Sequence, residues 1–204
     1  MYKKLLIIII YILPLCANAQ TAVSILDNAT SSLKKIKCLK SRYTLKLTEN
    51  GKTTSHTGCI IMQGNKYVNY INGTTIWFNG KIMWTLVESN DEVTITQPSL
   101  SELSNSNPYH FLNSYKVDFN SKLIHSTGNI YIIQLIPQKP NNELKKIIIS
   151  ISKTNFQPTK IELHTNKSTI SISIKTYESI RPYNSKTFTF NKKHYPDVEI
   201  IDLR

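Results

Sequence analysis

Residues 76–98 read IWFNGKIMWTLVESNDEVTITQP, and this stretch contains three strand signals separated by two turn signals. Apolar and polar residues alternate on both sides of Asn79-Gly80, the dipeptide best suited to a two-residue hairpin turn with positive φ at its central positions. A second turn falls around Asp91, and the run after it ends at Pro98. The stretch therefore predicts an antiparallel meander that carries large aromatic side chains.

The same period of two recurs along most of the chain, between short groups of Asn, Gly, Ser and Pro. One face of each predicted strand is apolar and the other carries Lys, Thr, Ser and Glu, which predicts a sheet with one face turned away from water. A sheet of so many strands must curl or close. The apolar positions are Tyr43, Leu45 and Leu47; Gly58, Ile60 and Met62; Val68 and Tyr70; Ile82, Trp84 and Leu86; Val93 and Ile95; Ile133 and Leu135; Ile147, Ile149 and Ile151; Ile161 and Leu163; and Ile170, Ile172 and Ile174.

Helical signals occur in two places. Residues 22–36 have apolar side chains at helical spacing and predict an amphipathic helix of about four turns. Between Pro98 and Leu123, the capping-box pair Ser99 and Glu102 and the helix start at Asn107-Pro108 predict two short helices. Residues 187–190 predict one more strand, and residues 195–204 predict an extended tail. The fold class is therefore mainly β with a few helices, an α+β protein built on a curved antiparallel sheet.

The first nineteen residues are typical of a cleavable signal peptide. Lys3 and Lys4 precede an apolar run, and Ala17-Asn18-Ala19 provides a small-x-small cleavage site, so we expect a single mature domain over residues 20–204. The alternative is a lipoprotein signal that ends at Cys16, but Leu15 is larger than the residue that lipoprotein processing requires at that position. The sequence thus predicts an exported protein.

The chain is strongly basic, with a formal net charge of +12 over 204 residues. Lys and Arg are spread along the chain without an arginine-rich block, and an exported protein does not meet a genome, so nucleic acid is not expected as a partner. Attraction to an anionic membrane surface or an acidic partner fits the compartment, and a solvated basic surface without a specific role fits equally well.

Two cysteines remain after the signal, and an exported protein could join them in a disulfide. If Asn50-Gly51 closes a two-residue hairpin, however, Cys59 lies opposite Arg42 and is displaced by four residues from Cys38, which is outside bridging range. A longer turn would change this register. The hairpin prediction therefore favours two free thiols.

Catalytic and metal-binding signals are weak. The five histidines are scattered, and none has a partner four residues away that would place two ligands on one helical face. The acidic pairs, Asp91-Glu92 and Glu199 with Asp202, fall in a turn and a tail, where little burial is expected to shift a pKa. No nucleophile elbow, phosphate loop or dinucleotide motif occurs. We expect no catalytic residue, metal ion or cofactor, and no enzymatic activity.

The apolar sheet face is larger than a few helices can easily bury, which leaves two interpretations. It is either filled as an ordinary core or left partly open as a cavity for lipid, because an acyl chain needs shelter from water at about 0.8 kcal/mol per methylene. The predicted cavity-lining residues are Tyr43, Leu45, Leu47, Ile60, Met62, Val68, Tyr70, Trp84, Leu86, Ile133, Leu135 and Ile149. The predicted lid residues are Leu26, Leu33, Phe111 and Leu112.

The order of these parts resembles that of the LolA-type outer-membrane lipoprotein carriers. The resemblance rests on Gly58, Asn79-Gly80-Lys81 with Trp84, Pro98, Leu135-x-Pro137, Pro158 before Ile161, Phe188-x-Phe190, and a C-terminal stretch YPDVEIIDLR that is similar to the LolA-like proteins of the Bacteroides group. It implies an open half-barrel whose concave face is covered by the N-terminal amphipathic helix and the short mid-chain helices.

The resemblance also implies a function and partners. It implies a periplasmic chaperone, working as a monomer, that takes triacylated lipoproteins from an inner-membrane ABC release complex and hands them to an outer-membrane acceptor. Members from enteric bacteria have an Arg-Pro pair after the second strand that latches the lid, and this chain has Gly64 and Asn65 there. The alternatives are a periplasmic lipid-sensing half-barrel module and an envelope polysaccharide-binding protein.

Overall fold

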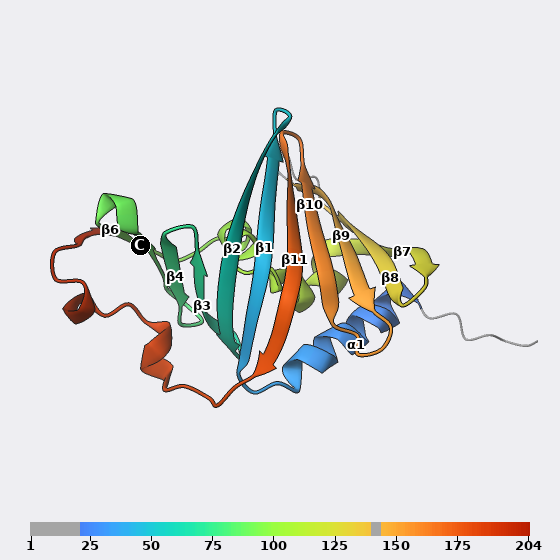
Figure 1. Ribbon diagram of the computed structural model, residues 1–204, viewed down its shortest axis with the longest axis horizontal. Helices are drawn as coiled ribbons and strands as arrows, with labels where there is room; N and C mark the ends of the chain where they lie inside the picture. Colours follow the sequence, from blue (N-terminus) through green and yellow to red (C-terminus); the bar gives the residue numbers. More distant parts are fainter. Residues whose placement is uncertain (1–20, 140–143) are drawn as a thin grey trace, which may run out of the picture.

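A computed structural model describes residues 21–139 and 144–204 of the chain, so the predicted signal peptide lies outside the described residues. In the described residues, twelve strands form a single curved sheet that remains open, in the order β12-β6-β5-β4-β3-β2-β1-β11-β10-β9-β8-β7 (Figure 1). Neighbouring strands run antiparallel except for β12, which pairs parallel to β6. This is the open half-barrel that the sequence predicted.

Most strands follow the predicted alternating segments. Two predictions are wrong: residues 119–127 form a strand that no alternation indicated, and residues 187–190 contain the end of a 3-10 helix, so the last strand lies in the predicted tail. Their bounds are β1 Leu39–Glu49, β2 Lys52–Gln63, β3 Lys66–Ile71, β4 Thr74–Phe78, β5 Met83–Val87, β6 Glu92–Thr96, β7 Phe119–Thr127, β8 Ile130–Pro137, β9 Leu144–Ser152, β10 Pro158–Thr165, β11 Ser168–Ser179 and β12 Glu199–Asp202. The α-helices are α1 Ala22–Lys34, α2 Leu100–Ser106 and α3 Tyr115–Asp118, and the 3-10 helices are η1 Glu88–Asn90, η2 His110–Asn113, η3 Ser185–Phe188 and η4 Lys192–His194.

The β1–β2 hairpin closes with the predicted two-residue turn. Asn50 and Gly51 have φ angles of 50° and 75°, the left-handed values that Asn and Gly tolerate best. Glu49 pairs with Lys52, and the register carries through to Arg42 opposite Cys59. Cys38 and Cys59 are both free thiols, as this register predicted.

The β4–β5 connection differs from the sequence prediction. Phe78 pairs with Met83, so residues 79–82 form a four-residue loop in place of a two-residue turn. The Asn79 side chain accepts hydrogen bonds from the backbone N–H groups of Lys81 and Ile82, both at 2.9 Å, and Gly80 has a φ of 99°. The side chain of Asn79 thus stabilises a wider loop than its usual hairpin chemistry suggests.

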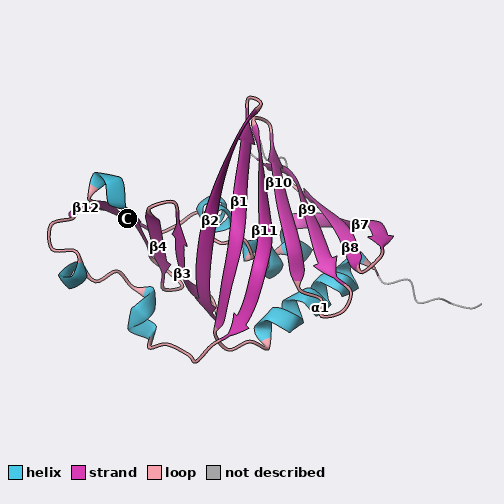
Figure 2. Cartoon of the chain, in the orientation of Figure 1, coloured by secondary structure: helices cyan, strands magenta, loops and turns pink. Residues whose placement is uncertain are grey.

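Four helical elements cover one face of the sheet, and we call them the lid: α1, α2, η2 and α3. Figure 2 shows them behind the strands. Helix α1 begins at the Thr21 N-cap and buries its apolar stripe, whereas α2 begins at Ser99 with the predicted capping box to Glu102. The face of the sheet under the lid is called the inner face, and the opposite face is the outer face.

The C-terminal segment, residues 180–204, runs over the outer face of β3–β6 and then joins the sheet edge as β12. Phe188 and Val198 contribute to a second hydrophobic cluster together with Val68, Trp77, Leu86 and Val93 from the strands. Phe190 and Tyr195 lie against Trp77, with ring centroids 5.7 and 5.9 Å apart. The expectation that one face of the sheet meets water is therefore wrong for much of β3–β6, where the C-terminal segment covers apolar residues on the outer face.

Candidate functional site

The inner face and the lid together bury one continuous hydrophobic cluster. The sheet contributes residues such as Ile133, Leu135 and Ile149, each 0% exposed, and the lid contributes its apolar side chains from above. All four predicted lid residues lie in this cluster: Leu26, Leu33, Phe111 and Leu112. The covered inner face is the candidate functional site.

Eight of the twelve predicted cavity-lining residues lie on the inner face. Seven belong to the cluster under the lid: Tyr43, Leu45, Ile60, Met62, Ile133, Leu135 and Ile149. Leu47 shares their side of β1 but is half-buried near the tip of the β1–β2 hairpin, opposite Thr54. Among the described residues, the lid packs on the inner face and shares one buried cluster with it.

The other four predictions are wrong in their placement. Val68, Trp84 and Leu86 pack in the second cluster, on the outer face, against the C-terminal segment. Tyr70 also points outward and is 45% exposed. The physical reason is that β3–β6 have apolar residues on both faces, so alternation alone does not tell which face lies under the lid.

A set of buried polar side chains joins the sheet to the lid, and we call it the polar seam. Its members are Ser41, Tyr43, Tyr67 and Asn69 from the sheet and Ser106 and Tyr109 from the lid, each 7% exposed or less. Tyr43 Oη donates to Asn69 Oδ1 at 2.8 Å, and Asn69 Nδ2 donates to the Ser106 carbonyl at 2.9 Å. The hydroxyls of Tyr67 and Ser106 are 2.5 Å apart, and those of Ser41 and Tyr109 are 2.8 Å apart.

Sequence reasoning identified only Tyr43 of this set. Tyr67 and Asn69 occupy the inner-face positions of β3, where the prediction had placed Val68 and Tyr70. Burial raises the pKa values of Tyr43, Tyr67 and Tyr109 to about 12, so all three hydroxyls are neutral at physiological pH.

One glycine makes room for the seam. Tyr43 of β1 pairs with Gly58 of β2, and the Tyr43 ring lies across the glycine. A Cβ at Gly58 would lie 2.6 Å from Cε2 of the Tyr43 ring and closer still to Cζ and Oη. Gly58 is therefore required so that the Tyr43 hydroxyl can reach Asn69.

The lid elements are also tied to each other. Asp27 of α1 accepts a hydrogen bond from the Tyr115 hydroxyl and forms an ion pair with Lys116 at 2.6 Å, so α1 and α3 are joined at one carboxylate. The hydrogen bonds from Lys116 and Tyr115 lower the pKa of Asp27. Both partners of the ion pair are about half exposed, which limits its contribution to stability.

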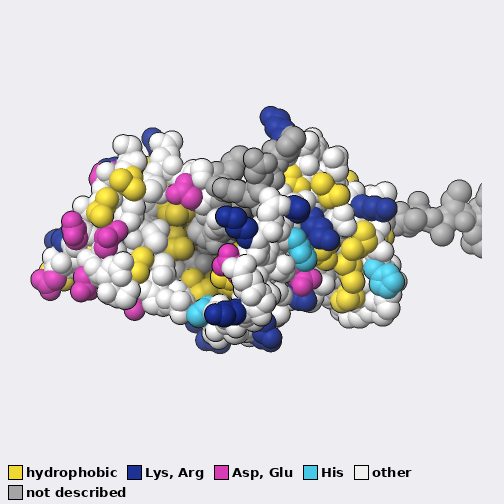
Figure 3. All heavy atoms as spheres, turned by 90° about the horizontal axis from the view of Figure 1, so that it is seen from above, with side chains coloured by type: hydrophobic (Ala, Val, Ile, Leu, Met, Phe, Trp, Pro, Cys, Tyr) yellow, Lys and Arg dark blue, Asp and Glu magenta, His cyan; other side chains and the backbone are white. Residues whose placement is uncertain are grey.

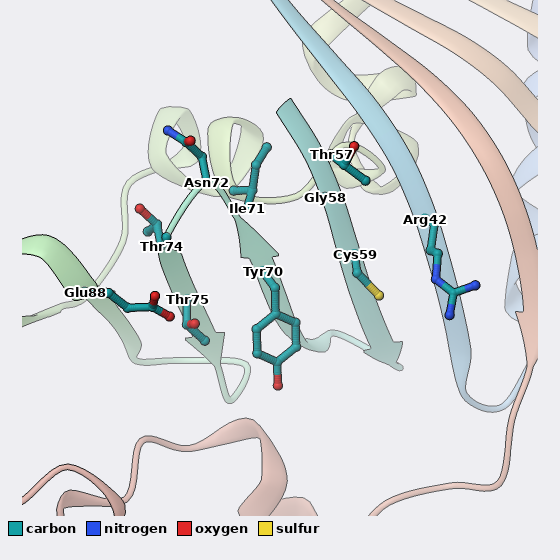
Figure 4. A pocket seen from close by; sticks show the side chains of 11 residues that line it. Arg42, Thr57, Gly58, Cys59, Tyr70, Ile71, Asn72, Thr74, Thr75 and Glu88 are labelled. Carbon is teal, nitrogen blue, oxygen red and sulfur yellow. The ribbon is translucent and has the colours of Figure 1, made fainter. Parts of the chain in front are cut away.

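A separate, shallow pocket lies on the outer face. It has a volume of about 320 Å³ and lies over β1–β4, with Arg42, Cys59, Tyr70 and Glu88 among its lining residues. Tyr70 extends from β3 between Thr75 and Cys59 (Figure 4). Arg42 is paired with Glu178 at 3.4 Å, so its charge is already partly balanced.

The surface charge is unevenly distributed. Seen from above, acidic side chains gather over the end of the molecule that holds β6 and β12, and most basic side chains lie over the remainder (Figure 3). Within residues 21–139 and 144–204, no helix is long and apolar enough to cross a membrane. Over the same residues, no three His, Cys, Asp or Glu side chains gather into a group that could hold a metal ion.

Comparisons with known proteins agree with this architecture. Residues 14–167 match the model of the family described as outer membrane lipoprotein carrier protein LolA, which is well over half of the chain. No curated protein matches.

Among solved structures, an uncharacterized conserved protein from Thermus thermophilus is similar at a TM-score of 0.61 and 9% identity, over 89% of this chain and 98% of that one. A LolA superfamily protein from Nitrosomonas europaea is similar at a TM-score of 0.50 and 14% identity, over 84% and 99% of the two chains. At these identities the structural likeness shows the fold alone.

Proposed function

The chain belongs to the LolA family of outer membrane lipoprotein carriers, and from that premise we propose that it shelters the acyl chains of lipoproteins between the inner face and the lid. It carries them across the periplasm, from the inner to the outer membrane. The protein binds and releases its cargo as a monomer, without a cofactor and without catalysing a chemical step.

The observation that supports this proposal most strongly is how the inner face is covered. The lid consists of short, separate helical elements that hold the face by apolar packing and a few seam hydrogen bonds. The strand ladders do not depend on it, because every strand is paired with other strands. The lid can therefore separate from the sheet while the half-barrel remains intact.

The energies of opening and of acyl burial are of the same order. Seven large side chains on the lid side are buried where the lid packs on the inner face: Ile25, Leu26, Leu33, Tyr109, Phe111, Leu112 and Tyr115. Exposing them costs roughly 10–20 kcal/mol at about 1.5–3 kcal/mol each, whereas burying one chain of about 15 methylenes gains about 12 kcal/mol. The free energy gained by burying one acyl chain therefore barely offsets the cost of opening the lid, whereas burying two or three chains exceeds it. This favours triacylated lipoproteins over singly acylated ligands as the cargo.

The partners follow from the direction of transport. We propose that the protein takes its cargo from an inner-membrane ABC release complex and delivers it to an outer-membrane acceptor. Its predicted signal peptide, residues 1–19, and its basic surface fit a periplasmic protein that meets anionic membrane surfaces. Nucleic acid has no part in this function.

A displacement assay tests the proposal. A fluorescent hydrophobic probe bound to the folded protein should be displaced by a synthetic peptide that carries a triacylated cysteine. Leu45→Glu places a charge in the inner-face cluster and should abolish both forms of binding, because an unpaired charge is strongly disfavoured there.

The matched control is Thr44→Glu, which places the same charge one residue away on the outer side of β1. It should bind like the wild type. Failure of the wild type to bind probe and peptide, or equal loss of binding in both variants with the fold retained, would argue against the carrier function.

A further inference from the structure

The polar seam is unusual because it places hydrogen-bonding groups in the middle of an apolar interface. Its sheet-side members lie among inner-face residues such as Ile60, which is 0% exposed. A buried polar group is unfavourable unless it is hydrogen-bonded, and an apolar side chain of similar size would fill the same space at no such cost. These groups therefore invite a functional explanation.

The seam bonds fall into two classes when the lid separates from the sheet. The bond from Tyr43 to Asn69 lies within the sheet and persists. The bonds of Ser41, Tyr67 and Asn69 to the lid all break, since their partners are Ser106 of α2 and Tyr109 beside η2. Opening the lid thus leaves three polar groups on the inner face without partners.

Two of these three groups, Tyr67 and Asn69, donate the hydrogen bonds that break. Ser106 Oγ donates to the Glu102 carbonyl at 2.7 Å, so the hydrogen between Tyr67 and Ser106 comes from Tyr67. Asn69 Nδ2 donates to the Ser106 carbonyl, while Asn69 Oδ1 remains occupied by Tyr43. The Ser41 hydroxyl can donate as well. An opened inner face therefore presents two donors on β3 and a hydroxyl on β1.

The three polar groups, Ser41, Tyr67 and Asn69, lie close together on the inner face. Ser41 pairs with Ile60, and Ile60 pairs with Asn69, so Ser41 and Asn69 lie in one row across β1, β2 and β3. Two strand spacings separate them by about 10 Å. Tyr67 is two residues from Asn69 on the same side of β3. This span suits a head group with several closely spaced acceptors attached to chains that continue over apolar surface.

We propose that Ser41, Tyr67 and Asn69 bind the ester and amide carbonyl oxygens at the head of an acylated ligand once the lid has moved. Such carbonyls accept hydrogen bonds and cannot donate them, so they match the groups that opening leaves unpaired. A plain hydrocarbon chain offers no acceptor and leaves all three unsatisfied. The inner face thus selects acylated head groups over simple apolar molecules. This inference rests on the carrier function proposed above.

A matched pair of variants tests the proposal. Tyr67→Phe and Ser106→Ala break the same hydrogen bond between sheet and lid, but only Tyr67→Phe removes a group that faces the ligand. Affinities are measured for the triacylated-cysteine peptide and for a fluorescent alkyl probe that contains no carbonyl group. The ratio of the two affinities is the quantity compared.

Ser106→Ala should leave this ratio within twofold of the wild type, even if both ligands bind more tightly to a looser lid. Tyr67→Phe should lower it by about fivefold to tenfold, which corresponds to one hydrogen bond lost with the peptide alone. An unchanged ratio in Tyr67→Phe, or an equal change in both variants, overturns the proposal.

A second pair guards against misfolding of the first. Ser41→Ala and Tyr109→Phe break the other hydroxyl contact between sheet and lid, and only Ser41→Ala removes a sheet-side group. Ser41→Ala should lower the ratio of peptide affinity to alkyl-probe affinity, as Tyr67→Phe does, whereas Tyr109→Phe should leave it within twofold of the wild type. If the wild type binds neither ligand, the carrier function itself fails together with this inference; if it binds both and the ratios do not respond, only the assignment of the three residues fails.

Discussion

Replacing Gly58 by alanine should destabilise the protein through a single defined contact. The added Cβ would lie 2.6 Å from Cε2 of Tyr43, and the Tyr43 ring is 1% exposed and has no free space to enter. Overpacking of this kind costs about 1–3 kcal/mol. Displacing the ring also breaks its hydrogen bond to Asn69, and leaving that pair buried and unsatisfied adds about 1–3 kcal/mol.

Alanine in a strand regains about 0.5–1 kcal/mol relative to glycine, so the net loss should be about 1–5 kcal/mol. Urea unfolding followed by circular dichroism measures this free energy of unfolding. A double-mutant cycle then isolates the contact: in a Tyr43→Val background, Gly58→Ala should no longer destabilise the protein and should instead stabilise it by about 0.5–1 kcal/mol. A cost that is the same in both backgrounds, or negligible in the wild type, would refute the role assigned to Gly58.

Three further outcomes are expected. The stability of the fold should fall between pH 10 and 12, because the buried seam tyrosines stay protonated to about pH 12 in the folded protein and ionise near pH 10 when unfolded. At pH 11 each such tyrosine should cost roughly 1.4 kcal/mol, and Tyr67→Phe should reduce the loss of stability at pH 11 by about that amount. A flat profile would contradict the burial of these hydroxyls. Phe188→Ala should lower the free energy of unfolding by about 3–5 kcal/mol, since the Phe188 side chain is 0% exposed between the C-terminal segment and the sheet. Limited proteolysis of this variant should then cut within residues 180–204. Resistance to proteolysis equal to that of the wild type would count against the packing of this segment. Thiol labelling of protein unfolded without reductant should modify both Cys38 and Cys59, whereas a disulfide would leave them unlabelled.

Local signals predicted much of the fold. The Asn50-Gly51 turn fixed the register of β1 and β2, and the capping box at Ser99 marked the start of α2, because both depend on residues that are close in sequence. The wider loop after Phe78 was missed because the Asn79 side chain bonds two backbone N–H groups instead of supporting the tighter turn.

The alternation of apolar and polar residues could not show which side chains of β3–β6 lie on the inner face and which lie on the outer face. Residues 180–198 run over the outer face of these strands, and Phe188 shares a buried cluster with Val68, which is more than a hundred residues away in sequence. One local signal was available: Gly64 and Asn65 form a two-residue turn that pairs Met62 with Tyr67. Counting from that turn places Tyr67 and Asn69 on the inner face and reveals the sheet side of the polar seam.

Hydrogen exchange in the presence of a triacylated-cysteine peptide tests the central claim that the lid separates from an intact sheet to admit acyl chains. On binding, backbone amides of α2 and η2 should exchange faster, because their packing on the inner face is lost, while those of β1, β2 and β8–β11 should keep their protection. Peptide that binds with no change in the exchange of α2 and η2, or that fails to bind at all, would contradict the account.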